Sequence, residues 1–210
     1  MKLYEIDSQY MEYLYKADSK VLIHNSGNHQ RKFIAIKVLI NGYKYFVPLS
    51  SPDKRDYYND QDGHKKVQFT RVPTIKRIFN GNPTVESYLG KLLFNNMIPV
   101  PEGEYSLVDV NGTKDQQYRY LMQAESREIN RQKNRIMKNA DIVYKHKLRN
   151  GNSTPLAKRT NNFVELEKRY RIYYRWLYCV GKIKKRNRSP SPERKANCPC
   201  VKSVKWKSKF

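Results

Sequence analysis

Two β-rich segments joined by Asn-Gly constrain the fold of this chain more than any other feature. Residues 33–40 (FIAIKVLI) and 43–47 (YKYFV) are rich in β-branched and aromatic side chains, and Asn41-Gly42 lies between them. Asn-Gly readily adopts the two positive φ angles of a two-residue hairpin turn, so the pattern predicts an antiparallel hairpin. Because the two strands have similar lengths, the loop before the first strand is expected to lie beside the turn that follows the second.

Several other short segments have the composition of strands. They lie at residues 2–6, 67–72, 88–100 and 104–110. The last two flank a Pro-Glu-Gly sequence at 101–103, which is typical of a turn.

Three segments have helical patterns. One begins at Ser8, the second covers residues 115–148, and the third begins at Asn162; Ser and Asn are favourable N-cap residues. In the second segment, an apolar position recurs every seven residues and therefore stays on one helix face: Met122, Ile129, Ile136 and Val143. Together with the strands, these helices predict an α+β body.

The net charge indicates the kind of partner. The chain has 42 Lys and Arg residues against 19 Asp and Glu, a net charge of +23. So large an excess destabilises the compact state unless a polyanion neutralises it; nucleic acid is the first candidate and an anionic membrane surface the competitor. Residues 182–210 hold 11 basic side chains and one acid, with too few apolar residues for a core or a membrane-binding face. We therefore expect one domain at 1–181 and a basic, Ser/Pro-containing, mobile tail at 182–210.

Several classes of protein are excluded by what the sequence lacks. Glu5 and Asp7 stand where a secretory signal would be apolar, and no apolar run approaches the roughly 20 residues needed to cross a bilayer. A cytoplasmic protein without a membrane partner is therefore expected. Cys198 and Cys200 have no second cysteine pair to complete a structural zinc site, so neither a metal nor another cofactor is expected.

The residues after the second hairpin strand form a candidate phosphate site. In Ser50-Ser51-Pro52-Asp53-Lys54, Ser51 suits an N-cap and Pro52 the first helical position. A helix start directs free backbone N–H groups at an anion, and Lys54 adds a positive charge. The same sequence is also typical of a capped helix that binds nothing.

The loop before the first hairpin strand supplies further cations. Residues 24–32 are polar and contain His29, Arg31 and Lys32. If the hairpin strands end side by side, one or two of these cations lie near Ser51. Such a loop can also be charged only because it is solvated.

The order of these motifs resembles the ToxN/AbiQ family, the protein toxins of type III toxin–antitoxin systems. The resemblance covers about residues 1–178 and lies in a series of segments: 3–14, 33–36, 48–52, 89–92, 97–100, 106–109, 118–148 and 162–170. The series as a whole is more specific than any one segment.

The resemblance implies a fold, an activity and a partner. It implies an antiparallel, highly twisted, barrel-like sheet surrounded by helices, with a long basic helical region toward the C-terminus. It also implies a metal-independent, sequence-selective endoribonuclease that leaves 2′,3′-cyclic phosphate and 5′-hydroxyl ends on cellular or phage mRNA. Such toxins are inhibited by a small repetitive pseudoknot RNA, which they trim and with which they form closed assemblies, so no protein antitoxin is expected. Their role is growth arrest or abortive defence against phage.

The resemblance also assigns residues to the active site. Ser51 matches the family's active-site serine and Ser50 the hydroxyl residue before it, whereas Asp53 stands where the family often has lysine, so Lys54 takes that role. A second basic residue is expected at Arg31 or Lys32, with His29 in the preceding loop. Attack by the adjacent 2′-OH is mainly a positioning problem, and fixed donors stabilise the charge that develops on the phosphoryl oxygens. Ser51 therefore positions the phosphate, while Lys54 and His29 are candidates for proton transfer.

Basic and aromatic residues elsewhere are candidates for RNA binding. They comprise one set at helical spacing and a second set near the candidate site: Arg127, Arg131, Arg135 and Lys138, then Lys65, Lys66, Arg71, Tyr57, Tyr58 and Phe69. Basic residues contact phosphates, and aromatic rings stack on unpaired bases, although each ring could equally pack against the protein. The alternative to a ribonuclease is a non-catalytic RNA- or DNA-binding protein, which needs nothing from Ser51.

Overall fold

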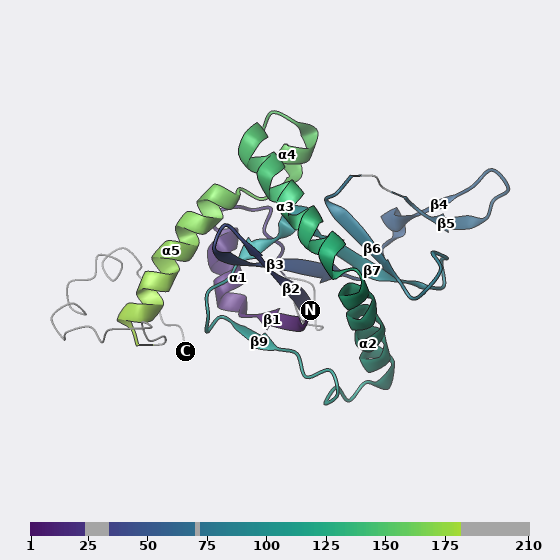
Figure 1. Ribbon diagram of the computed structural model, residues 1–210, viewed down its shortest axis with the longest axis horizontal. Helices are drawn as coiled ribbons and strands as arrows, with labels where there is room; N and C mark the ends of the chain where they lie inside the picture. The colour runs from purple at the N-terminus through teal and green to yellow at the C-terminus, as the bar shows by residue number, and fades with distance from the viewer. Residues whose placement is uncertain (24–33, 70–71, 182–210) are drawn as a thin grey trace.

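The protein is built on a curled, antiparallel seven-stranded sheet, seen in a computed structural model of which we describe residues 1–23, 34–69 and 72–181 (Figure 1). The strand order is β6-β7-β3-β2-β1-β9, and β8 pairs with β3 beside this path. The strands are β1 (Leu3–Ile6), β2 (Ile34–Ile40), β3 (Tyr43–Ser50), β6 (Ile75–Phe79), β7 (Tyr88–Leu93), β8 (Ile98–Pro99) and β9 (Tyr105–Leu107). The predicted α+β class with a twisted antiparallel sheet is confirmed. Residues 182–210 lie outside the described residues.

The central hairpin forms as predicted and is longer than its sequence suggested. Asn41 and Gly42 have φ angles of 48° and 77°, and Ala35 lies opposite Pro48, so β2 begins beside the end of β3. β3 continues to Ser50, past the predicted end at residue 47, because its last two residues pair with β7 on the other side. The end of β3 is therefore held within the sheet.

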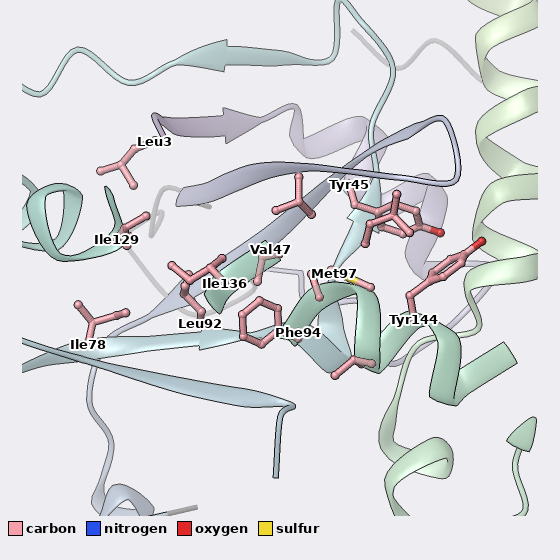
Figure 2. Close-up of a cluster of buried hydrophobic side chains, with 14 of the residues drawn as sticks. Leu3, Tyr45, Val47, Ile78, Leu92, Phe94, Met97, Ile129, Ile136 and Tyr144 are labelled. Atoms are coloured by element: carbon pink, nitrogen blue, oxygen red, sulfur yellow. The ribbon is translucent and has the colours of Figure 1, made fainter. Parts of the chain in front are cut away.

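β3 is apolar on both faces because each face is covered. Tyr45 and Val47 belong to the cluster beneath the helices that follow the sheet, and Figure 2 shows them there with Leu92 and Ile136. Phe46, which points the other way, belongs to a second cluster formed with the first and last helices. A strand with both faces buried has a continuous apolar run, which explains the YFV sequence.

The helices lie on both faces of the sheet (Figure 1). They are α1 (Ser8–Tyr15), α2 (Gln116–Arg131), α3 (Lys133–Asn150), α4 (Pro155–Arg159) and α5 (Phe163–Cys179). Asn162 caps α5 as predicted, but the cap of α1 is Asp7, whose carboxylate accepts a hydrogen bond from Tyr10 N at 3.0 Å. None of the described helices has the length and apolar composition that crossing a bilayer requires.

The single helix predicted over 115–148 is wrong, because the chain bends at Gln132. This residue has φ −104° and ψ 16° and lies between α2 and α3. The hydrogen bonds continue through it, from Gln132 N to Glu128 O and from Ile136 N to Gln132 O. The apolar residues on both sides of the bend remain buried against the sheet, so the sequence periodicity does not reveal it.

Several strand predictions are corrected by the structure. Of the strand predicted over 67–72, only Val67 is in a strand among the described residues, and it ends β5 (Lys65–Val67). β5 pairs with β4 (Tyr57–Asn59) in a separate two-stranded sheet, and β6 was not predicted. The strand predicted over 88–100 is interrupted by a 3₁₀ turn, η2 (Phe94–Asn96). Strand β9, within the segment predicted at 104–110, pairs with β1 at the edge of the sheet opposite β6.

A buried carboxylate joins the last helix to the sheet. Glu167 Oε1 on α5 accepts hydrogen bonds from the hydroxyls of Tyr45 and Tyr144, both at 2.7 Å. Burial and this carboxylate raise the pKa of Tyr144 to about 12. The three side chains therefore tie β3, α3 and α5 together at the end of the hairpin away from Ser50.

Candidate active site

The Ser51 turn, which we define as residues 50–54, leaves β3 and enters a short 3₁₀ helix, η1 (Lys54–Asp56). The prediction that Ser51 caps a helix with Pro52 at its first position is wrong. Asp53 is the cap, since its Oδ1 accepts a hydrogen bond from Arg55 N at 2.8 Å. The helix starts two residues later than predicted because the Asp53 carboxylate takes the capping position.

Two of the three backbone amides of η1, and the amide of its cap Asp53, already have hydrogen-bond acceptors. Asp53 N donates to Asp56 Oδ2 at 2.9 Å, and Asp56 N donates to Asp53 O at 2.9 Å. The amide of Arg55 is occupied by Asp53, as described above. These three amides are therefore not available to the expected phosphate cradle.

A buried ion cluster of Asp53, Asp56, Arg77 and Lys91 fixes the turn from below. Lys91 Nζ on β7 lies 2.9 Å from Asp53 Oδ2 and 2.6 Å from Asp56 Oδ2, and Arg77 Nη2 on β6 lies 3.2 Å from Asp56 Oδ1. The side chains of Asp56 and Lys91 are only 3% and 8% exposed. Buried charges of this kind are tolerated only when paired and hydrogen-bonded.

The cluster shifts both carboxyl groups toward the ionised form. The hydrogen bond from Lys91 lowers the pKa of Asp53 to about 2. Burial alone would raise the pKa of Asp56, but the hydrogen bonds from Lys91 and from Asp53 N outweigh it, so that this pKa is lowered as well. Both carboxyl groups are therefore ionised at neutral pH.

The predicted reactive groups lie on the solvent side of this support. Ser51 and Lys54 are exposed, and Ser50 is half-buried with its hydroxyl donating to Ser51 O at 3.2 Å. Within the described parts of the chain, neither the Ser51 hydroxyl nor the Lys54 ammonium has a hydrogen-bond partner. The structure thus brings together Ser50, Ser51 and Lys54 of the predicted set. His29, Arg31 and Lys32 lie outside the described residues.

Sequence reasoning missed the close approach of β7 to both β3 and α2 beside this turn. Gly90 on β7 lies so close to β3 that a Cβ there would be 2.7 Å from Ser50 O and 3.1 Å from Glu125 Oε1. Glu125 is 5% exposed, and burial raises its pKa to about 8. A glycine inside a strand pattern often marks such a close approach, and this was the available signal.

The predicted aromatic and basic residues of the β4–β5 hairpin have mixed environments. Tyr58 is 47% exposed, whereas Tyr57 packs edge-on against Tyr88. Lys65 Nζ lies 4.1 Å from the centre of the Tyr57 ring, and Lys66 pairs with Asp60 at 3.1 Å. Arg71 lies outside the described residues. Tyr58 and Lys65 are therefore the members of this set that stay most available to RNA.

An acidic group in the same hairpin was not anticipated from the sequence. Asp60, Asp62 and His64 place possible metal-ligand atoms within 4.8 Å of one another. Asp60 Oδ1 accepts hydrogen bonds from the amides of Asp62 and His64. Its other oxygen pairs with Lys66. These hydrogen bonds and this ion pair explain why the three side chains lie close together, since they stabilise a turn.

The predicted basic helix face is divided by the bend at Gln132. Arg127 and Arg131 lie on α2, and Arg135 and Lys138 lie on α3, all of them exposed. Arg131 Nη2 pairs with Glu128 at 2.7 Å. Only Arg131 and Arg135 line a cavity beside β6, so the four residues do not form one straight track.

Comparisons with known proteins agree with this architecture. The family model described as toxin ToxN, type III toxin–antitoxin system, matches residues 2–171. The endoribonuclease ToxN of Pectobacterium atrosepticum is 32% identical over 175 residues, which cover 82% of this chain and 94% of that protein.

Two solved structures have the same fold. One concerns a bacterial antiviral system regulated by a processed non-coding RNA; its TM-score is 0.67 at 29% identity, over 81% of this chain and 98% of that one. The other concerns selective inhibition of a type III toxin by a non-coding RNA pseudoknot; its TM-score is 0.64 at 27% identity, over 82% and 97%.

The curled sheet, the covering helices and the exposed turn define a type III toxin fold. This chain belongs to the ToxN family. The resemblance noted in the sequence is thereby confirmed.

Proposed function

We propose that this chain is a sequence-selective endoribonuclease toxin that cleaves single-stranded RNA at the Ser51 turn. The proposal rests on one observation: the exposed side chains of Ser51 and Lys54 project from a turn that the buried ion cluster anchors. Its relative in Pectobacterium atrosepticum bears the name endoribonuclease. Rigidly held donors beside an open surface suit a reaction that depends on positioning.

The 2′-oxygen gives up its proton and attacks the adjacent phosphorus. The bond from phosphorus to the 5′-oxygen breaks and that oxygen takes up a proton, which leaves a 2′,3′-cyclic phosphate and a 5′-hydroxyl without a metal. The Ser51 hydroxyl donates a hydrogen bond to a non-bridging phosphate oxygen. The Lys54 ammonium stabilises the negative charge as it increases, and the Ser50 hydroxyl rotates away from Ser51 O to donate to a second oxygen. One such donor typically contributes about 10²–10³ in rate. Ser51 is not the nucleophile, because the 2′-OH already performs that step.

The proposed partner is a small repetitive antitoxin RNA that folds as a pseudoknot. The two solved relatives concern toxins controlled by non-coding RNA, and the positive charge of this chain suits such a partner. The toxin trims this RNA from a precursor and is inhibited by it in a closed toxin–RNA assembly. Release of the toxin in the cytoplasm exposes cellular or phage mRNA to cleavage, so that growth stops or phage infection is aborted.

The test compares wild type with Ser51→Ala on a long, mostly unstructured RNA in EDTA. Discrete fragments with cyclic phosphate ends are expected from wild type and not from the variant. Ser106→Ala, at an exposed serine on β9, is the matched control and should cleave like wild type. Equal cleavage by Ser51→Ala would place the active site elsewhere. RNA that is bound but left intact by wild type would instead indicate the non-catalytic binding protein.

A further inference from the structure

A cavity of about 640 Å³ lies along β6, the first strand in the sheet order. Its walls come from β6, from the α2–α3 bend and from the chain that follows β5. Figure 1 shows β6 beside the junction of α2 and α3. Its volume is within the range of about 300–1,000 Å³ that is typical of small-ligand sites.

Cations dominate the charged groups of this β6 cavity. Lys76, Arg77, Arg131 and Arg135 line it, and none of its described lining residues is acidic. Burial lowers the pKa of Lys76, and repulsion by the nearby Arg135 lowers it further. An anion in the cavity would relieve this repulsion.

Two hydrogen-bond donors of Arg77, which lines the β6 cavity, are unpaired in the described structure. Its side chain is 10% exposed, and Nη2 is used by Asp56. Nε and Nη1 are buried and have no hydrogen-bond partner in the described structure. Leaving buried donors unpaired is unfavourable, and a phosphate oxygen in the cavity would pair with one of them through a charge-assisted hydrogen bond.

The cavity also has groups that suit a nucleobase. Phe69 is 86% exposed, which is unusual for a phenylalanine, and Phe79 also lines the cavity. The amides of Gln68, Gln132 and Asn139 lie in the same cavity and offer both donors and acceptors. An aromatic ring for stacking, amides for base edges and arginine for phosphate are the elements of single-stranded RNA recognition.

We propose that the β6 cavity is a nucleotide-selective subsite that binds one nucleotide of single-stranded RNA outside the bond that is cut. The inference rests on the proposed function and extends it. The base stacks on Phe69, and its phosphate pairs with one free donor of Arg77 and with Arg135. Because Arg77 also holds Asp56, and Asp56 holds the amide of Asp53, the subsite is joined directly to the support of the Ser51 turn. The bound nucleotide thereby sets which phosphate reaches Ser51.

The test uses a single-stranded RNA that wild type cuts at one bond and a series in which each nucleotide in turn is abasic. Cleavage is followed as kcat/KM, and binding by fluorescence anisotropy. In wild type, an abasic nucleotide at one position outside the cut dinucleotide should lower kcat/KM and binding affinity by about 5- to 150-fold each, the range for loss of one stacked base. In Phe69→Ala the same replacement should have less than a twofold effect, since no ring remains to stack.

Two further variants separate base recognition from phosphate binding. Tyr15→Ala, at an exposed aromatic residue that does not line the cavity, should keep the wild-type pattern. Arg135→Ala should weaken binding of every RNA in the series alike and reduce its salt dependence, as loss of a phosphate contact does.

The outcomes distinguish this inference from the proposed function. Identical abasic profiles for wild type and Phe69→Ala would overturn the subsite even if cleavage remains dependent on Ser51. If wild type binds RNA and only Phe69→Ala loses the sensitivity to the abasic position, but no RNA is cleaved, the subsite is supported and the proposed activity is overturned.

Discussion

The ammonium of Lys91 lies 2.6 Å from a carboxylate oxygen of Asp56, and both side chains are almost fully buried. Through this contact a residue in the middle of β7 determines where the backbone turns after β3. The chemistry proposed for Ser51 and Lys54 therefore depends on a pair of charges that RNA does not need to touch.

Removing Lys91 should damage stability and activity together. Lys91→Met leaves Asp56 buried without its main partner, and breaking a buried pair in this way typically costs about 3–5 kcal/mol in the free energy of unfolding. Urea unfolding measures this change, and cleavage in EDTA should fall in the fraction that remains folded. Lys54→Met is the matched control, because Lys54 is exposed: its stability should stay within about 0.5 kcal/mol of wild type, with cleavage reduced about 10²–10³-fold. Normal stability in Lys91→Met would contradict the anchoring role.

A methyl group at position 90 should disturb the active turn. Gly90→Ala would place Cβ 2.7 Å from Ser50 O, and since this atom is backbone, relief requires β3 and β7 to separate. We expect a loss of about 1–3 kcal/mol in unfolding free energy and slower cleavage. In Gly112→Ala the new Cβ would meet only the carboxylate end of Asp109, which can rotate away, so that this control should cleave normally. Equal behaviour of the two variants would argue against the close approach.

Glu125 should make stability fall as pH rises. Its pKa is about 8 in the folded protein against an ordinary 4.5, owing to burial. Between these two values the folded state holds a proton that the unfolded state has lost, so the unfolding free energy decreases by up to about 1.4 kcal/mol for each pH unit. Glu125→Gln removes this contribution, and its stability advantage over wild type should grow from pH 4.5 to pH 8 and then level off.

The control for that measurement is Glu12→Gln, at an exposed position on α1. Its stability relative to wild type should not vary with pH across the same interval. A difference between wild type and Glu125→Gln that is constant with pH would show that Glu125 ionises normally in the folded protein.

The basic C-terminal segment should contribute affinity and not catalysis. A chain that ends at Gly181 lacks 11 basic side chains and one acid. The slope of log Kd against log salt should become shallower, since fewer counterions are released, while the truncated chain still cleaves RNA. Loss of all cleavage would show that residues 182–210 belong to the enzyme proper.

Much of the fold could be predicted because local patterns and tertiary structure agree there. Asn41-Gly42 fixes the hairpin wherever it lies in the protein, and Asn162 caps α5 by a purely local bond. The bend at Gln132 was missed because both helices bury the same apolar stripe. Strand β6 was missed because Ile75–Phe79 alternates only weakly, being an outer strand of the sheet.

The sequence predicted which residues make up the candidate active site but not the buried side chains that hold it in place. Ser50, Ser51 and Lys54 are adjacent in the sequence, so any local argument groups them. Lys91 and Arg77 reach the turn only through strand pairing, 35 and 21 residues away from Asp56. For the same reason the sequence pointed to Ser51 as the cap, since nothing local shows that the carboxylate of Asp53 is held in place by Lys91.

The composition of the ion cluster has a consequence for how the protein meets RNA. Two cations and two anions face one another beneath the turn, so their fields cancel a few ångströms away and add nothing to long-range attraction. The long-range attraction of RNA then depends on the surplus lysines and arginines elsewhere, and it weakens as salt screens these charges. The geometry of the proposed cleavage site instead depends on mostly buried contacts, which salt screens much less. A homologue could therefore gain or lose surface charge, and with it speed of encounter, without altering the bond it breaks.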